Sequence, residues 1–166
     1  MIGGLDDVHI DSEAPHRSWR SVSEDRDTVR TARCCCSGLK VVASAEPRLV
    51  LACHCVECQR RTGSVFGVSA YFRKADISLS GPSKMYIRDG QDGRKLRIHF
   101  CPDCGTSVYW ELDILPGHYG VAVGAFADSG FPAPIQSLWE QDRHPWVGFE
   151  HNPSRMARQL GSEGVK

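Results

Sequence analysis

The sequence predicts a mostly β fold with little helix, and three observations support this prediction. Short stretches rich in Val, Ile, Tyr and Phe recur between turn-forming residues, as they do in all-β proteins. Only residues 57–62 have helical character. The eight cysteines gather in three clusters, which is typical of zinc sites. We therefore expect an all-β protein, built as a two-sheet sandwich or a partly open barrel and pinned by zinc.

Eight segments have the composition of short strands, and turn signals such as Pro116-Gly117 separate them. The predicted strands are residues 39–44, 48–52, 67–72, 84–87, 96–100, 107–112, 118–126 and 135–140. Gly63 should end the helix of residues 57–62 within two turns. A second short helix is expected around residues 154–160.

The length of 166 residues suits one domain with one core. Residues 1–30 are polar with mixed charge and predict an N-terminal extension, in which Trp19 is the one residue able to anchor it. Residues 31–150 carry the cysteines and the predicted strands, so they form the expected zinc-binding domain. Residues 151–166 are predicted to be a polar C-terminal tail.

Charge and hydropathy exclude several classes of partner. Lys and Arg number 20, as do Asp and Glu, so the basic excess of a protein that neutralises nucleic-acid phosphates is missing. Residues 1–7 show no secretory signal. The most apolar stretch, residues 119–127, is far shorter than the ~20 residues of a membrane helix. We predict a cytoplasmic protein with no nucleic-acid or membrane partner, whose clustered cysteines bind metal rather than form disulfides.

The clearest ligand motif is the pair Cys101 and Cys104. Two thiolates three positions apart on a tight turn can both reach one zinc ion at about 2.3 Å. Pro102 presets the turn, and Gly105 tolerates the positive φ that such a turn needs. A redox-active pair is the alternative, but the two accompanying clusters favour a zinc knuckle.

The first cluster consists of Cys34, Cys35 and Cys36. If this segment is an extended strand, residues i and i+2 share one face, and the two outer sulfurs can bind a common ion. Cys35 would then point the other way, as a small buried side chain or a free thiol.

The middle cluster places three cysteines within six residues. Cys53 and Cys55 should share one strand face by the same parity, and Cys58 should return from the following turn. His54 should point away from them, although it remains an alternative ligand.

Seven cysteines divide most economically into one closed site and one open site. The closed site would contain Cys34, Cys36, Cys101 and Cys104, and the open site Cys53, Cys55 and Cys58. Four protein ligands make a structural site, whereas three leave a position for water or substrate. A rival division joins Cys55 and Cys58 to Cys101 and Cys104, but it leaves three cysteines without a site. We therefore expect two zinc ions per chain, one structural and one catalytic.

These motifs resemble the glutathione-dependent formaldehyde-activating enzyme family, which includes the centromere protein V branch. The resemblance covers about residues 31–150 and is carried by the C-x-C of the first cluster, the string CHCxxCxxxTGS from Cys53 to Ser64, FCxxCGT from Phe100 to Thr106, and LWE with RHPWV from Leu138 to Val147. The chain departs from the family pattern because Ser37 precedes the glycine that usually follows the first C-x-C directly.

The resemblance implies β-sheets pinned by structural zinc, and a carbon–sulfur lyase that joins formaldehyde to glutathione as S-hydroxymethylglutathione. Position by position, it assigns the four-cysteine site to structure and Cys53, Cys55 and Cys58 to catalysis. The implied partners are glutathione or a similar small thiol and a small aldehyde. The oligomeric state stays open.

Candidate substrate contacts follow directly after the open site. Arg60 and Arg61 can offset an anionic metal centre or bind the carboxylates of a glutathione-like peptide. Thr62 can donate a hydrogen bond to sulfur or substrate. The alternatives are solvated charge on a short helix for the arginines and helix-end packing for Thr62.

Other residues and functions remain open on the sequence alone. His99 is a candidate hydrogen-bond donor near the metal or an exposed strand histidine, and Trp110, Trp139 and Trp146 are expected in the core rather than in a substrate wall. A non-enzymatic zinc module would close the second site with His99 or Cys35. A thiol sensor would lose zinc from that site on oxidation.

Overall fold

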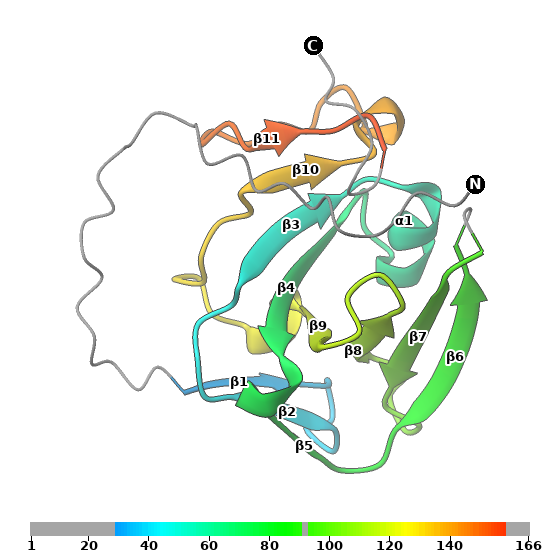
Figure 1. Ribbon diagram of the computed structural model, residues 1–166, viewed down its shortest axis with the longest axis vertical. Helices are drawn as coiled ribbons and strands as arrows, with labels where there is room; N and C mark the ends of the chain where they lie inside the picture. Colours follow the sequence, from blue (N-terminus) through cyan, green and yellow to red (C-terminus); the bar gives the residue numbers. More distant parts are fainter. Residues whose placement is uncertain (1–28, 91–92, 159–166) are drawn as a thin grey trace, which may run out of the picture.

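The computed structural model describes residues 29–90 and 93–158, and in this part of the chain strands predominate (Figure 1). Most of the extension predicted over residues 1–30, including Trp19, lies outside the described residues, as does the end of the predicted tail. No described helix has the length and apolar character that crossing a membrane requires.

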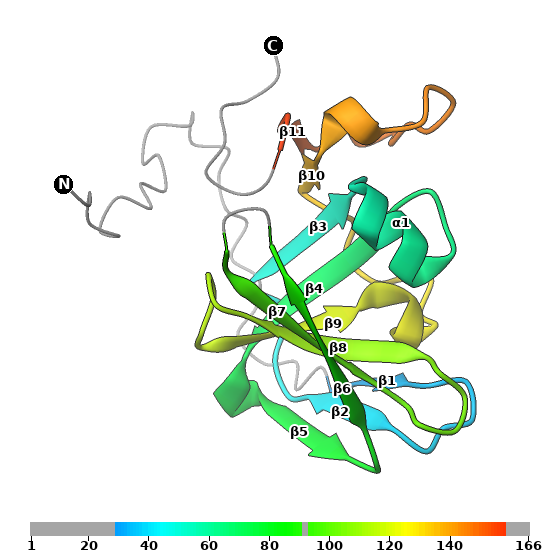
Figure 2. The ribbon, with the colours of Figure 1, turned by 90° about the vertical axis from the view of Figure 1, so that its right-hand side faces the viewer.

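The strands form two sheets, as the sequence predicts (Figure 2). The smaller sheet is antiparallel, in the order β1 (Arg30–Arg33), β2 (Lys40–Ala43) and β5 (Ile77–Ser80). The larger sheet has the order β11-β10-β3-β4-β9-β8-β7-β6. Its strands are β3 (Leu49–Cys53), β4 (Gly67–Arg73), β6 (Lys84–Asp89), β7 (Lys95–Phe100), β8 (Ser107–Leu112), β9 (His118–Ala122), β10 (Gln136–Leu138) and β11 (Ser154–Arg155). Within the described residues this sheet ends at β11 and β6, so it is not a closed barrel.

The helix predicted at residues 57–62 is confirmed as α1 (Val56–Thr62), and it ends where Gly63 adopts a left-handed conformation with φ 66°. Such a residue commonly ends a helix, because glycine has no Cβ to clash. Short 3-10 helices follow later in the chain. They are η1 (Lys74–Asp76), η2 (Val123–Phe126) and η3 (Glu140–Asp142).

Two predicted strands end too late, and one predicted helix is wrong. The strand predicted at 118–126 ends at Ala122, where the backbone turns into η2. The strand predicted at 135–140 ends before Trp139, whose left-handed backbone (φ 59°) turns the chain into η3. The helix expected around residues 154–160 is not present in its described part. Instead, β11 pairs parallel with β10, and the Ser154 N–H donates to the Ile135 carbonyl at 3.0 Å.

The two faces of the large sheet bury different apolar clusters. On one face the two sheets pack together, with Val41 of β2 and Phe72 of β4 in the same core. Tyr71 points to the opposite face, as alternate strand residues do, and there it packs with Cys53. Cys101 belongs to the first core. Cys34 and Cys101 therefore lie on one side of the large sheet, and Cys53 lies on the other.

Candidate metal centres

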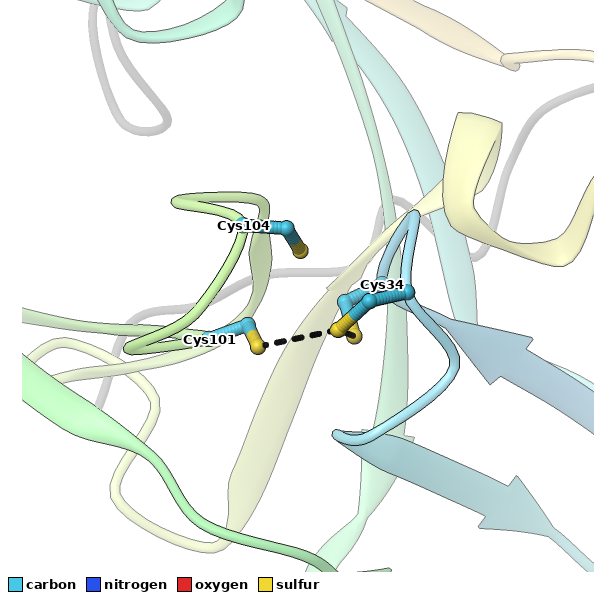
Figure 3. A group of neighbouring side chains, drawn as sticks. Cys34, Cys101 and Cys104 are labelled. Atoms are coloured by element: carbon cyan, nitrogen blue, oxygen red, sulfur yellow. Dashed lines mark hydrogen bonds between the residues drawn. The ribbon is translucent and has the colours of Figure 1, made fainter.

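The first sulfur group combines two loops that are far apart in the sequence. Cys34 and Cys36 follow β1, Cys101 and Cys104 follow β7, and their four sulfur atoms all lie within 4.8 Å of one another. Figure 3 shows Cys34, Cys101 and Cys104 pointing toward one another from these loops. The Sγ atom of Cys36 lies 3.5 Å from those of Cys34 and Cys101. Sulfurs around a tetrahedral zinc lie about 3.8 Å apart, so this donor set fits zinc.

The backbone at Cys34 is a turn and not the extended strand that parity predicts. The Ser37 N–H donates to the Cys34 carbonyl at 2.9 Å, and Ser37 has a φ of 61°. The Leu39 N–H donates to the Cys34 sulfur at 3.1 Å. The turn brings Cys34 and Cys36 together because it folds the chain back, and Cys35 is left exposed as a free thiol.

The second loop has the predicted knuckle geometry. The Gly105 N–H donates to the Cys101 carbonyl at 2.9 Å, and Gly105 has the expected positive φ of 72°. The Thr106 hydroxyl accepts from the Cys35 N–H at 3.2 Å and lies 3.3 Å from the Cys104 sulfur. The Thr106 hydroxyl first, and then its backbone N–H, lower the pKa of Cys104 to about 5. Cys104 is therefore predisposed to the thiolate form that binds metal.

The second sulfur group is local. Cys53 ends β3, Cys55 is the N-cap of α1 and Cys58 lies in its first turn, and their sulfurs lie within 4.8 Å of one another. The strand position predicted for Cys55 is wrong. Its sulfur instead accepts the Cys58 N–H at 3.4 Å, in the role that a serine or aspartate oxygen usually has at a helix start.

Protonation is unequal among these three thiols. Hydrogen bonds from Cys53 and then Cys55 lower the pKa of Cys58 to about 3, and the charges of Arg61 and Arg88 contribute further. The same interactions, together with burial, raise the pKa of Cys53. The group therefore has one ready thiolate and two thiols that a bound cation would deprotonate, which also fits zinc.

His54 points away from the sulfur group, as predicted, and is fully buried. Its Nε2 lies 3.1 Å from the Ser137 hydroxyl, which donates to Glu140 Oε1 at 2.5 Å. The Gln59 side-chain amide donates to the His54 carbonyl at 2.7 Å. Burial lowers the pKa of His54. This network ties the cysteine loop to the chain that follows β10.

A cavity of about 370 Å³ lies beside this group. It is lined by Cys58 and Arg61 of α1, by Tyr86 and Arg88 of β6, and by apolar side chains of β7 such as Ile98. The volume lies within the range of small-ligand sites. The three-cysteine group is thus reached from a cavity with cationic walls.

The predicted substrate contacts differ in their surroundings. Arg60 is exposed and pairs with Glu57 at 2.9 Å. The Arg61 guanidinium lies 4.4 Å from the centre of the Trp110 ring and borders the cavity. The Thr62 hydroxyl donates to the Cys58 carbonyl at 2.8 Å. Arg61 is the one of these three whose charged group has no acidic partner among the described residues.

The remaining candidates lie elsewhere. His99 stacks on Tyr109 with ring centres 4.4 Å apart and belongs to neither sulfur group. Trp110 is buried, as predicted, and Trp139 packs against the apolar cluster around Cys53. Trp146 is 72% exposed, so its predicted core position is wrong.

Arg88 and Tyr86 are residues that sequence reasoning did not single out. Strand alternation was the available signal. Tyr86 and Arg88 are two residues apart along β6, so their side chains are expected on the same face, opposite to those of Met85 and Ile87. In the sheet they pair with Leu96 and Ile98 of β7, and this pairing sets them on the face that carries the cavity.

Comparison with known proteins gives one family. The model of the glutathione-dependent formaldehyde-activating enzyme family matches residues 29–142, a segment that contains both sulfur groups. Among solved structures, the chain is similar to a crystal structure of a Rhodobacter sphaeroides protein, with 21% sequence identity and a TM-score of 0.44. That match covers 61% of this chain and 90% of the other. No curated protein matches.

Proposed function

This chain belongs to the glutathione-dependent formaldehyde-activating enzyme family, and we propose that it adds a thiol such as glutathione to formaldehyde or a related small aldehyde as a carbon–sulfur lyase. One observation carries the proposal: the group of Cys53, Cys55 and Cys58 has three ligands rather than four and borders a ligand-sized cavity. Three protein ligands are typical of catalytic zinc, and four are typical of structural zinc.

The proposed metal ligands are those of the two sulfur groups. Cys34, Cys36, Cys101 and Cys104 would hold structural zinc, and Cys53, Cys55 and Cys58 would hold catalytic zinc. When bound at the second group, zinc supplies a Lewis acid that lowers the pKa of a substrate thiol. The proposed domain spans residues 31–150, and the proposed location is the cytoplasm.

The reaction needs no oxidant or reductant. The substrate sulfur forms a bond to the aldehyde carbon, the carbonyl π bond breaks, and the proton released by the thiol ends on the former carbonyl oxygen. The side chains around the cavity bind and orient. Arg61 offers a charge-assisted hydrogen bond to an anionic part of the substrate, and the apolar side chains of β7 reduce the access of water.

Arg60 and Thr62 remain proposed contacts of a more peripheral kind. Arg60 would attract an anionic thiol to the mouth of the cavity, since its guanidinium is exposed to solvent. Thr62 would act indirectly, because its hydroxyl is bonded to the Cys58 carbonyl and so fixes the turn that carries this ligand.

The proposal is tested by visible absorption of the cobalt-substituted protein during titration with glutathione, since cobalt–thiolate bands report both occupancy and coordination. We expect a saturable spectral change in the wild type and none in Cys55→Ser. Formaldehyde added to the glutathione-loaded protein should then give S-hydroxymethylglutathione, detected by NMR. A fully loaded protein whose tetrahedral spectrum ignores glutathione would contradict the proposal and favour a non-enzymatic zinc module.

A further inference from the structure

The cavity beside Cys58 has two cationic walls that come from different parts of the fold. Arg61 is carried by α1, and Arg88 is carried by β6, the last strand of the large sheet. The register pairs Arg88 with Leu96, so its side chain leaves β6 on the face over which the apolar residues of β7 line the cavity. A ligand that occupies this cavity therefore has both Cys58 and Arg88 in its lining.

The charges on this cavity are not balanced. Glu57 also lines it, but this carboxylate pairs with Arg60 at 2.9 Å. Among the described residues, neither Arg61 nor Arg88 forms an ion pair with an acidic side chain. Arg61 is held against the Trp110 ring, whereas Arg88 has no such ring contact. An arginine that is half-buried and lacks an acidic partner is suited to bind an anion from solution.

Arg88 and Arg61 also differ in their relation to the sulfur group. Arg61 is on the same short helix as Cys58, and its guanidinium lies 4.4 Å from the centre of the Trp110 ring. Arg88 lines the same cavity from β6. A substrate whose sulfur lies at Cys58 can thus present a second, anionic group to Arg88, which is carried by a different element.

We propose that Arg88 is a specificity-determining residue that binds a carboxylate of the thiol substrate in the cavity that Cys58 also lines. This inference rests on the proposed function. It assigns to the site a thiol that bears a carboxylate several bonds from sulfur, and it predicts weak binding of neutral thiols. Tyr86 lies beside Arg88 on the same wall and adds contact area for the chain between the two groups.

The test compares glutathione with its diethyl ester, which carries the same thiol but no free carboxylate. Both ligands are titrated into cobalt-substituted wild type, Arg88→Gln and Arg88→Lys, with the dissociation constants taken from the cobalt–thiolate bands. Arg88→Gln should weaken glutathione binding about tenfold or more and leave ester binding within about twofold, because the variant removes a charge-assisted bond. Arg88→Lys should recover part of the affinity for glutathione.

Lys84→Gln is the matched control, since Lys84 is a cationic residue of the same strand and parity that does not line the cavity. It should leave both dissociation constants unchanged. Equal weakening of glutathione and ester in Arg88→Gln, or no weakening of either, would overturn the role of Arg88 while the proposed function stands. A wild type that responds to neither thiol would overturn the proposed function and this inference with it.

Discussion

The two cysteine groups consist of the same residue type, and they differ mainly in how far apart their members lie in the sequence. In the four-cysteine group, Cys36 and Cys101 lie 65 residues apart and their sulfurs are 3.5 Å apart. The members of the three-cysteine group all fall within the short segment from Cys53 to Cys58. A metal that closes a long loop removes more entropy from the unfolded chain than one that closes a short loop, here by about 2 kcal/mol. The first group is therefore placed to stabilise the fold, and the second contributes less to it.

Their surroundings follow the same division. Cys34 and Cys101 are buried in the core where the two sheets meet, so the first group ties the small sheet to the large one. Cys55 and Cys58 are partly buried, and Cys58 borders the cavity. A metal site that stabilises the fold is best shielded from solvent, whereas a metal site that binds a substrate must be reachable from solvent.

The largest expected effect is the loss of folding on breaking the four-cysteine group. Cys104→Ser removes one ligand at an exposed position, so no packing change is added. Structural zinc contributes ~10–16 kcal/mol, as much as a whole domain's net stability, so the variant should lack a cooperative thermal transition by circular dichroism. Cys35→Ser, an exposed neighbour outside the group, should melt like the wild type. A normal melting curve for Cys104→Ser would remove the structural role.

Breaking the three-cysteine group should abolish ligand binding without unfolding the protein. Cys55→Ser is the best variant because serine is itself a good N-cap, so the start of α1 is kept while a metal ligand is lost. We expect one zinc ion per chain instead of two by elemental analysis, and a melting temperature close to that of the wild type. Unfolding as complete as that of Cys104→Ser would show that both groups are structural.

Substitutions at two glycines test whether the two cysteine groups are independent, since one glycine lies near each group. A Cβ at Gly81 would lie 1.8 Å from the carbonyl oxygen of Gly38 in the loop after Cys36, at a φ of 92°. Backbone strain and overpacking each cost about 1–3 kcal/mol, so Gly81→Ala should be strongly destabilised. A Cβ at Gly120 would lie 2.2 Å from Trp110 Nε1.

Gly120→Ala should lower the free energy of unfolding by about 1–3 kcal/mol through overpacking alone. The cost is smaller than for Gly81→Ala because the added methyl group meets a side chain, which can shift, and not backbone. Trp110 carries the Arg61 guanidinium, so this variant should also weaken glutathione binding. Gly81→Ala should bind glutathione normally at a temperature where it is folded. Chemical denaturation and the cobalt titration together check both expectations. The reverse assignment, with Gly81→Ala impaired in binding, would contradict the separation of the two regions.

Local motifs let the sequence predict which cysteine sulfurs lie together. Cys101 and Cys104 lie on a turn whose geometry Gly105 fixes, and Gly63 ends α1, so both features depend on near neighbours alone. The parity argument for Cys34 and Cys36 brought together the right sulfurs for the wrong reason. It assumed a strand, while the left-handed Ser37 makes a turn there.

What the sequence could not predict depends on strand order. Arg88 reaches the cavity because β6 pairs with β7 at the end of the large sheet, and no local pattern encodes that neighbour. Strands β1 and β5 were not predicted because they are four residues long and carry polar side chains at three and two positions, respectively. The bond between His54 and Ser137 joins residues 83 apart in the sequence.

Removing the hydrogen bond between His54 and Ser137 should give the smallest effect of the predicted variants. It tests whether this bond holds the three-cysteine group in a geometry suited to metal binding. Ser137→Ala leaves His54 Nε2 and Glu140 Oε1 without their shared partner in a buried place, which should cost about 1–3 kcal/mol in the free energy of unfolding. Because His54 lies between two ligands, cobalt affinity should fall at the three-cysteine group and stay unchanged at the four-cysteine group. Ser69→Ala, at a buried serine of β4, is the control for losing a hydroxyl as such. If Ser137→Ala lowers stability but leaves the cobalt affinity of both groups unchanged, the hydrogen bonds of Ser137 support the fold and do not position the cysteine ligands.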